Sequence, residues 1–336
     1  MKKNINRKYI QFFFLVIILY IGYEFHNFVL YINSNGILGS LYRPPSVEAF
    51  LPISSLMSFY YFLQTGQIHY YHPAGLFIFL GILFTSFIVG KSFCSWICPF
   101  GLLSEYLNKL GIKLKISFNL PKILDSSLRS LKYLLLAFFT FAIFSMSIDG
   151  LKGFLDSDYN LLADVKMYYF FAKISTFAMI VLAVLVLLSI VIKNFWCRFL
   201  CPYGALLGII GLLSPVKIKR ESTTCIDCKL CDKVCPSNIE VSKVNYVISD
   251  ECSSCYECVT VCPKKDTLFT TAFKRKFDHK KIMYIILASY WLFVLIGIFS
   301  NKWTNNIPIE KYIEVNKKAD QLTHPRSIKE AKEFKE

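Results

Sequence analysis

Eight of the twelve cysteines in this chain fall into two runs with the same spacing. Each run reads C-x2-C-x2-C-x3-C-P, which is typical of bacterial proteins that hold two [4Fe–4S] clusters. In that pattern each tight loop supplies three thiolates to one cluster, and its fourth cysteine reaches the other cluster. The spacing therefore predicts one cluster on Cys225, Cys228, Cys231 and Cys262, and a second on Cys252, Cys255, Cys258 and Cys235.

Zinc sites and disulfide frameworks use cysteines differently. Zinc takes four Cys or Cys/His ligands, often as paired CxxC. Disulfide frameworks are typical of small secreted chains, and this chain has 336 residues. Two complete runs that each end in proline favour iron–sulfur clusters over both alternatives.

Long apolar blocks give the chain a hydrophobic content of 54% and a mean hydropathy of +0.45. A helix needs about 20 apolar residues to cross the hydrocarbon core, and the second and third blocks are marginal by this measure. The blocks lie at residues 9–30, 73–89, 133–148, 170–192 and 283–299. We therefore predict a mainly α-helical, polytopic membrane protein with about five transmembrane helices and an inserted ferredoxin-like domain of the bacterial 2[4Fe–4S] type.

This organisation predicts four parts of the chain. They are a membrane domain with four spans and two CxxxCP motifs at 1–215, a ferredoxin-like domain at 216–275, a fifth span at 276–302 and a polar tail at 303–336.

Charge predicts the orientation of the spans. The net charge is +15, and the basic residues flank the apolar blocks, which excludes nucleic acid as the expected partner. Loops 91–129 and 193–281 are rich in Lys and Arg, whereas loop 33–72 has only Arg43. The positive-inside rule then places the N-terminus, both CxxxCP motifs and the ferredoxin-like domain in the cytoplasm, and the tail outside.

The remaining four cysteines belong to an internal repeat. The segments that start at Phe93 and Trp196 both read aromatic-Cys-x3-Cys-Pro-aromatic-Gly-x-Leu. Proline disfavours helix at the residue before it and favours the first position of a new helix. We therefore expect two corners on the same side of the bilayer that bring together Cys94, Cys98, Cys197 and Cys201. Three roles remain open: ligands of a third cluster or another thiophilic metal, redox-active dithiols, or structural residues.

Several stretches resemble the NapH/MauN/NosR-type family of membrane iron–sulfur electron-transport proteins, over roughly residues 5–310. They are RPPSVEAFLPISSLM from Arg43, TGQIH from Thr65, KSFCSWICPFGLLSE from Lys91, WCRFLCPYGALLG from Trp196, LLSPVKIKR from Leu212 and the two cysteine runs. The resemblance implies a protein of the bacterial inner membrane with cytoplasmic clusters, whose relatives pass electrons from quinol toward reductases on the other side.

The sequence shows no motif for a nicotinamide or a flavin, so electrons must come from other carriers. We expect a relay between the quinone pool and a partner redox protein, such as a reductase or a ferredoxin, embedded in membrane lipid. Such a chain is an electron carrier or a quinol dehydrogenase-like subunit and no stand-alone enzyme. The alternatives are a copper-type metal reductase that uses the CxxxCP thiols, and a redox sensor or maturation factor for a partner reductase.

Overall fold

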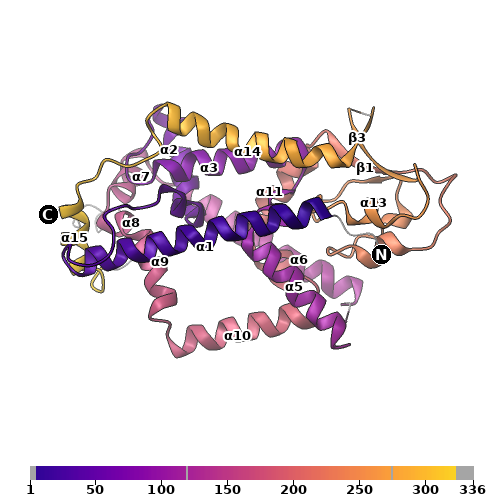
Figure 1. Ribbon diagram of the computed structural model, residues 1–336, viewed down its shortest axis with the longest axis horizontal. Coiled ribbons are helices and arrows are strands. Elements are labelled where there is room, and N and C mark those ends of the chain that lie inside the picture. The colour runs from indigo at the N-terminus through magenta and orange to yellow at the C-terminus, as the bar shows by residue number, and fades with distance from the viewer. Residues whose placement is uncertain (1–4, 119, 274, 323–336) are drawn as a thin grey trace. The chain divides into compact units, whose positions relative to one another are not determined.

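The computed structural model describes residues 5–118, 120–273 and 275–322 of a mainly helical chain (Figure 1). Its contacts divide the chain into two compact units. Unit 1 contains residues 1–16, 82–137 and 180–290, and unit 2 contains residues 17–81, 138–179 and 291–336. All twelve cysteines lie in unit 1.

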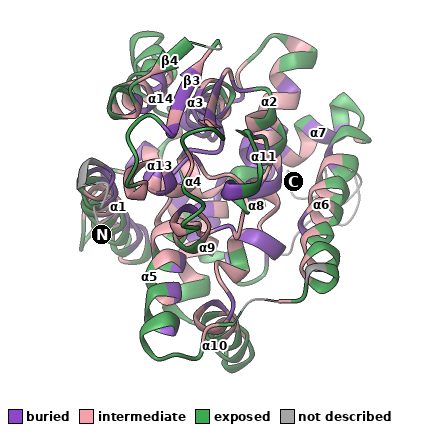
Figure 2. Cartoon of the chain, turned by 90° about the vertical axis from the view of Figure 1, so that its right-hand side faces the viewer, coloured by how far each residue is buried: buried purple, intermediate pink, exposed green. Residues whose placement is uncertain are grey.

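Five apolar helices each begin in one unit and end in the other. They are α1 (Ile5–Asn33), α3 (Pro73–Val89), α6 (Lys122–Phe144), α10 (Thr176–Val191) and α14 (Ile282–Phe299). Segments Arg7–Asn33, Ile123–Phe144 and His279–Phe299 are long and apolar enough to cross a membrane, and α9 (Ala163–Ala172) with α10 forms a candidate fourth span. Many residues of α6 and α10 are exposed (Figure 2), including the apolar Phe141 and Phe177, as expected for lipid-facing helices.

Two of these helices differ from the segments predicted by hydropathy. Helix α6 begins at Lys122, whereas the predicted apolar block begins at Tyr133. The first turns of the helix are amphipathic, so hydropathy alone does not include them in the block. The predicted continuous span 170–192 is broken between α9 and α10, which are bent by 83°. The break is encoded locally, because Ser175 Oγ accepts a hydrogen bond from the N–H of Ala178 at 3.2 Å and so caps α10.

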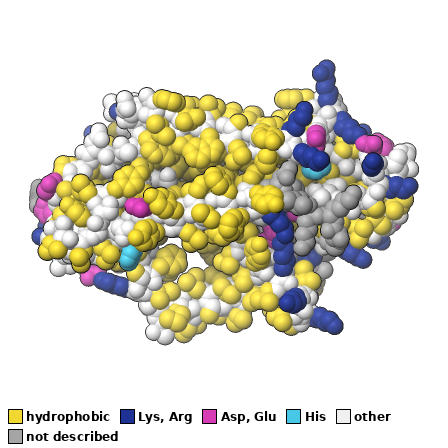
Figure 3. All heavy atoms as spheres, viewed as in Figure 1, with side chains coloured by type: hydrophobic (Ala, Val, Ile, Leu, Met, Phe, Trp, Pro, Cys, Tyr) yellow, Lys and Arg dark blue, Asp and Glu magenta, His cyan; other side chains and the backbone are white. Residues whose placement is uncertain are grey.

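Unit 1 contains an antiparallel sheet in the order β2-β1-β3-β4. The strands are β1 (Val216–Arg220), β2 (Tyr246–Val247), β3 (Leu268–Ala272) and β4 (Arg275–Phe277). Ile218 of β1 pairs with Val247 of β2 and with Thr270 of β3. The buried face of the sheet shares one apolar core with α1 and α14, which supply Ile10 and Ile286. Lys and Arg side chains gather over this part of the chain (Figure 3).

The helices of unit 1 that contain or follow the cysteines have 4 to 15 residues. They are α4 (Phe93–Trp96), α5 (Pro99–Lys113), a π-helical turn at Trp196–Leu200, α11 (Pro202–Leu212), α12 (Leu230–Val234) and α13 (Glu257–Val261).

Unit 2 is built from short helices between the apolar ones. They are a 3-10 turn at Pro45–Phe50, α2 (Pro52–Thr65), α7 (Ile148–Leu155), α8 (Asp158–Leu161), α9 and α15 (Ile309–Lys317). The predicted polar tail therefore contains a helix, and Tyr312 and Val315 of α15 are buried in the core of unit 2. The rest of that tail, residues 323–336, lies outside the described residues.

Candidate iron–sulfur centres

The two cysteine runs adopt the same backbone conformation. The second and fourth residues after the first cysteine have positive φ in both loops: Asp227 and Lys229 at 48° and 55°, and Ser254 and Tyr256 at 49° and 57°. Positive φ is uncommon for residues other than glycine. Its repetition shows that both loops make the same turn, after which α12 and α13 begin.

Two cavities lie beneath these loops, and each is lined by thiols of both runs. The first cavity has an empty volume of ≈ 370 Å³ and the second of ≈ 340 Å³. The first is lined by Cys225, Cys228, Cys231 and Cys262. The second is lined by Cys252, Cys255, Cys258 and Cys235. In each case the last thiol comes from the opposite run.

The other groups around these cavities suit a cluster of iron and sulfide. Leu230 and Leu268 line the first cavity, and Ile218 and Val247 of the sheet line the second. The N–H of Ile239 donates a hydrogen bond to Cys235 Sγ at 3.3 Å. Soft thiolates, an apolar shell and hydrogen bonds to sulfur are the features that hold and tune iron–sulfur clusters. Such a cluster, when bound, supplies one-electron redox chemistry.

The CxxxCP motifs form two matching corners. Cys98 and Cys201 are the N-cap residues of α5 and α11, with extended backbone and proline as the first helical residue. Cys201 Sγ accepts a hydrogen bond from the N–H of Gly204 at 3.2 Å. Gly101 holds the equivalent position after Cys98, but the Cys98 thiol makes no such cap hydrogen bond with the described residues. The prediction that each proline starts a new helix is therefore confirmed by these two corners.

The corners bring the four remaining thiols together. Burial, together with the nearby Cys98 and Cys201 thiols, raises the pKa of the Cys94 thiol to about 12, although the Lys91 ammonium acts in the opposite direction. Burial also raises the pKa of Cys98 to about 11 and that of Cys197 well above its usual value. Cys197 lies within electrostatic range of the other three thiols.

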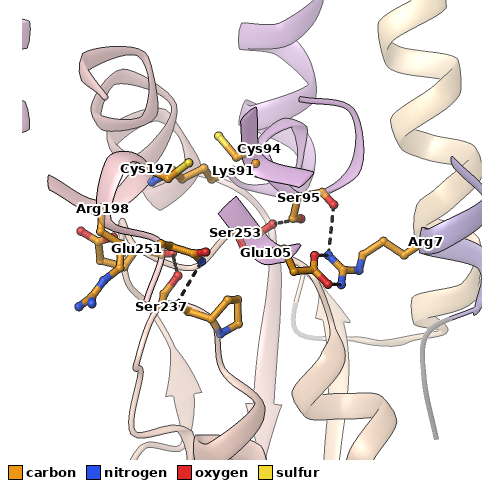
Figure 4. Close-up of a pocket in the computed structure, with 13 residues that line it drawn as sticks. Arg7, Lys91, Cys94, Ser95, Glu105, Cys197, Arg198, Ser237, Glu251 and Ser253 are labelled. Atoms are coloured by element: carbon orange, nitrogen blue, oxygen red, sulfur yellow. Dashed lines mark hydrogen bonds and ion pairs between the residues drawn. The ribbon is translucent and has the colours of Figure 1, made fainter. Parts of the chain in front are cut away.

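A cavity with an empty volume of ≈ 480 Å³ adjoins these thiols. Its lining includes Cys94, Cys197 and Lys91 (Figure 4). Lys91 is only 4% exposed. Within the described ranges, no three or more His, Cys, Asp and Glu side chains are grouped so that they could hold a single metal ion.

Hydrogen bonds join the first corner to the second ferredoxin loop. Ser95 Oγ donates to the carbonyl oxygen of Ser253 at 2.6 Å. Trp96 Nε1 donates to the carbonyl oxygen of Ser254 at 2.9 Å, and Trp96 is fully buried. The loop between Cys252 and Cys255 is thus fixed directly to the residues between Cys94 and Cys98.

Buried ion pairs that the sequence analysis missed complete the site. Arg7 pairs with Glu105 and Glu257, both at 2.9 Å. Lys132 of α6 is completely buried and pairs with Glu251, the residue before Cys252. Arg7 and Lys132 border the apolar blocks 9–30 and 133–148, where basic residues are expected at the membrane interface, so the sequence indicated neither their burial nor their partners.

These features define a membrane protein of the iron–sulfur electron-transport class. A family model described as a 4Fe-4S binding domain matches residues 71–117 and again 174–221, and one described as a 4Fe-4S dicluster domain matches residues 217–268. The double match shows that the internal repeat is real, with one CxxxCP motif in each copy.

Known proteins agree with this class. The chain is 37% identical over 326 residues to YccM of Escherichia coli, whose name describes an electron transport protein, covering 95% of this chain and 91% of that protein. It is 28% identical to the ferredoxin-type protein NapH of Haemophilus influenzae over 59% of this chain and 67% of NapH. It is 23% identical to the methylamine utilization ferredoxin-type protein MauN of Methylobacillus flagellatus over 57% of this chain and 62% of MauN. No solved structure matches the chain. The chain belongs to the ferredoxin-type membrane electron-transport family that includes these proteins.

Proposed function

We propose that this protein relays electrons between the quinone pool and a partner redox protein through two [4Fe–4S] clusters. The observation that carries the proposal is the pair of four-thiol cavities, which are joined by hydrogen bonds and ion pairs to residues of α1, α4 and α6. Each cluster accepts or gives one electron, so the protein links a two-electron quinone to a one-electron carrier.

The proposed cluster ligands are the two crossed sets that line the cavities. Replacement of Cys262 by Ser should damage the same cluster as replacement of Cys228, although the two belong to different runs. Anaerobic EPR of the dithionite-reduced full-length protein gives the spectrum that remains in each variant. Matching residual spectra for C262S and C228S support crossed ligation. A C262S spectrum that instead matches that of C255S contradicts it.

A cleft beside the second cluster cavity suits a quinone head group, because ≈ 610 Å³ of its empty volume of ≈ 1340 Å³ is accessible to water. It lies where α5 and α10 end and is lined partly by Ile112, Lys193 and Ile239. Ile239 also lines the second cluster cavity, and its N–H donates a hydrogen bond to Cys235 Sγ. This one residue therefore forms part of the wall of both the cleft and the cavity. A volume of about 300–1,000 Å³ is usual for small-molecule sites.

The charges of the cleft favour a carbonyl or anionic oxygen. Lys115, Lys193 and Lys233 line it, and none of the three forms a salt bridge with a described residue. Three carboxylates also line the cleft, and each has a partner of its own. Asp125 is paired with Arg198 at 2.7 Å, Glu240 with Lys243 at 3.1 Å, and Asp232 accepts hydrogen bonds from Ser242. The lysines are therefore available as donors to a quinone oxygen.

The surroundings of the cleft favour a ligand that comes from the membrane. Ile116 and Phe118, which follow α5, are 48% and 50% exposed, and Ile123 at the start of α6 is 84% exposed. Apolar side chains at the end of membrane helices suit the chain of a lipid-soluble quinone better than the surface of a soluble protein.

The cleft makes a specific kinetic prediction. Anaerobically reduced protein in nanodiscs is mixed with a short-tailed quinone, and cluster oxidation is followed by absorbance. Two reduced clusters lose one electron each, and two protons from water convert both quinone carbonyls to hydroxyls. Lys193→Gln should raise the quinone concentration for half-maximal rate about tenfold, the effect of about 1.4 kcal/mol.

Lys113→Gln is the matched control, because Lys113 is exposed on α5 and does not line the cleft. Equal rates for the two variants would show that the quinone binds elsewhere. Clusters that no quinone oxidises would refute the relay itself.

We also propose that the chain crosses the bacterial inner membrane five times, with unit 1 on the cytoplasmic side and the tail outside. All five unit boundaries fall inside α1, α3, α6, α10 and α14, and successive helices run in alternate directions between the units. In this topology we keep the predicted domain boundaries after residues 215, 275 and 302. Reporter fusions that placed loop 33–72 in the cytoplasm would contradict it.

A further inference from the structure

We propose that Cys94, Cys98, Cys197 and Cys201 together hold a third [4Fe–4S] cluster, shared between the two CxxxCP repeats, with Lys91 as its buried counter-charge. This inference goes beyond the two-cluster relay, and it does not depend on which carrier exchanges electrons with the protein.

The first support is that two of the thiols lie at helix N-termini. Cys98 and Cys201 are the N-cap residues of helices of 15 and 11 residues, and Cys201 Sγ accepts a hydrogen bond from the N–H of Gly204 at 3.2 Å. The partial positive charge at a helix N-terminus stabilises a thiolate. A structural cysteine with a neutral thiol gains little from this arrangement.

The second support is the packing of each corner. A Cβ atom on Gly101 would lie 1.9 Å from the carbonyl oxygen of Cys94, so only glycine lets the helix return so closely to the first cysteine of its motif. In the second corner, a Cβ on Gly204 would lie 3.5 Å from the carbonyl oxygen of Cys197. In both repeats the start of the helix thus lies against the carbonyl group of the first cysteine, more closely in the first repeat.

The third support is Lys91, a buried ammonium beside these thiols. Its side chain is 4% exposed and forms no salt bridge or hydrogen bond with any described residue. Glu251 lies in the same cavity, but it is bound to Lys132. Lys91 lies within electrostatic range of Cys94, Glu251, Cys197 and Cys201, with Cys94 first among them.

A buried ammonium that no carboxylate binds directly is costly, and thiolates in electrostatic range lower that cost. A [4Fe–4S] core on four thiolates carries a net negative charge, which Lys91 offsets. Each thiol loses its proton as its sulfur binds an iron. A disulfide or a pair of neutral dithiols supplies no such charge, so the geometry favours the cluster over those roles.

The position of the site suits electron transfer to the second cluster. Ser95 and Trp96 lie between Cys94 and Cys98, and both donate hydrogen bonds into the loop between Cys252 and Cys255. The third centre would therefore be connected to its neighbour by two direct hydrogen bonds.

Metal analysis of the full-length protein tests this inference. After anaerobic reconstitution we expect about twelve iron and twelve sulfide per chain, against about eight for two clusters. Cys94→Ser/Cys197→Ser should remove about four iron and leave the EPR signals of the other two clusters. A count of eight in the wild-type protein, or bound zinc or copper in place of iron, would overturn the proposal.

Lys91→Met gives an independent measurement that does not remove a ligand. Loss of the positive charge should make the third cluster harder to reduce and shift its potential to a more negative value. Lys91→Arg keeps the charge and should restore the potential, while the ferredoxin clusters keep theirs in both variants. If Lys91→Met leaves every cluster potential unchanged, Lys91 is not the counter-charge. A third cluster that quinones cannot oxidise would support this inference while refuting the relay.

Discussion

Gly208 of α11 controls how closely the second ferredoxin loop approaches the CxxxCP corners. A Cβ atom at this position would lie 2.6 Å from the carbonyl oxygen of Asp250, two residues before Cys252. Ordinary contact begins at 3.4 Å, so Gly208→Ala requires the loop to retreat by about 0.8 Å. The added Cβ would meet a backbone carbonyl oxygen, so no flexible side chain can move aside to relieve the clash.

Overpacking of this size costs about 1–3 kcal/mol. Gly22→Ala is the matched control, because Gly22 lies in helix α1 and has nothing within 4 Å of the added Cβ. Both variants gain the helix propensity of alanine, about 1 kcal/mol, so that contribution largely cancels when they are compared. The two variants should differ by the cost of the clash alone.

The assay is anaerobic loss of iron to an excess of chelator, followed by the absorbance of the clusters. If iron is lost from a transiently opened loop, the rate follows the population of the open form. Gly208→Ala should then lose iron from the second cluster about 5–150-fold faster than Gly22→Ala. Equal rates would show that the loop does not depend on its contact with α11.

Two further substitutions test buried contacts elsewhere. Glu48→Gln should destabilise unit 2 by about 3–5 kcal/mol, because the completely buried Glu48 pairs with Arg43 at 2.8 Å and accepts a hydrogen bond from the N–H of Gly75 at 2.8 Å. Thermal unfolding in detergent measures this loss, and an unchanged midpoint temperature would refute it. Trp96→Phe should lower the stability of the second ferredoxin loop by about 1–3 kcal/mol, because it leaves the carbonyl oxygen of Ser254 without its hydrogen-bond donor. The variant should lose iron faster than the wild-type protein, and equal rates would contradict this prediction.

Local patterns predicted much of the site. Cysteine spacing constrains the turn of each loop, and the cavities group the thiols into the same crossed sets. Pro99 and Pro202 marked the first residues of α5 and α11, since proline fixes φ and needs no hydrogen-bond partner there. The helix starts could be predicted because they depend on residues that are adjacent in the sequence, whereas the crossed ligand sets join distant cysteines and stay a prediction.

Long-range pairs could not be predicted in this way. Arg43 binds Asp164, which is 121 residues away, and Lys132 binds Glu251, which is 119 residues away. No periodicity or spacing links such residues, and only the packed chain brings them together. The break before α10 was also missed, because the flanking segments are both apolar and Ser175 is a weak signal within them.

The way in which unit 1 is assembled couples its folding to its clusters. Each ferredoxin cavity needs thiols from both runs, and Arg7 joins the start of α1 to Glu105 of α5 and Glu257 of α13. Metal binding to ligands that are apart in the unfolded chain contributes directly to folding free energy. Removal of iron should therefore loosen α1 and α5 as well as the cysteine loops. Hydrogen exchange of these helices, with and without clusters, would detect that coupling, and unchanged protection of α5 would show that the membrane helices fold independently of the metal.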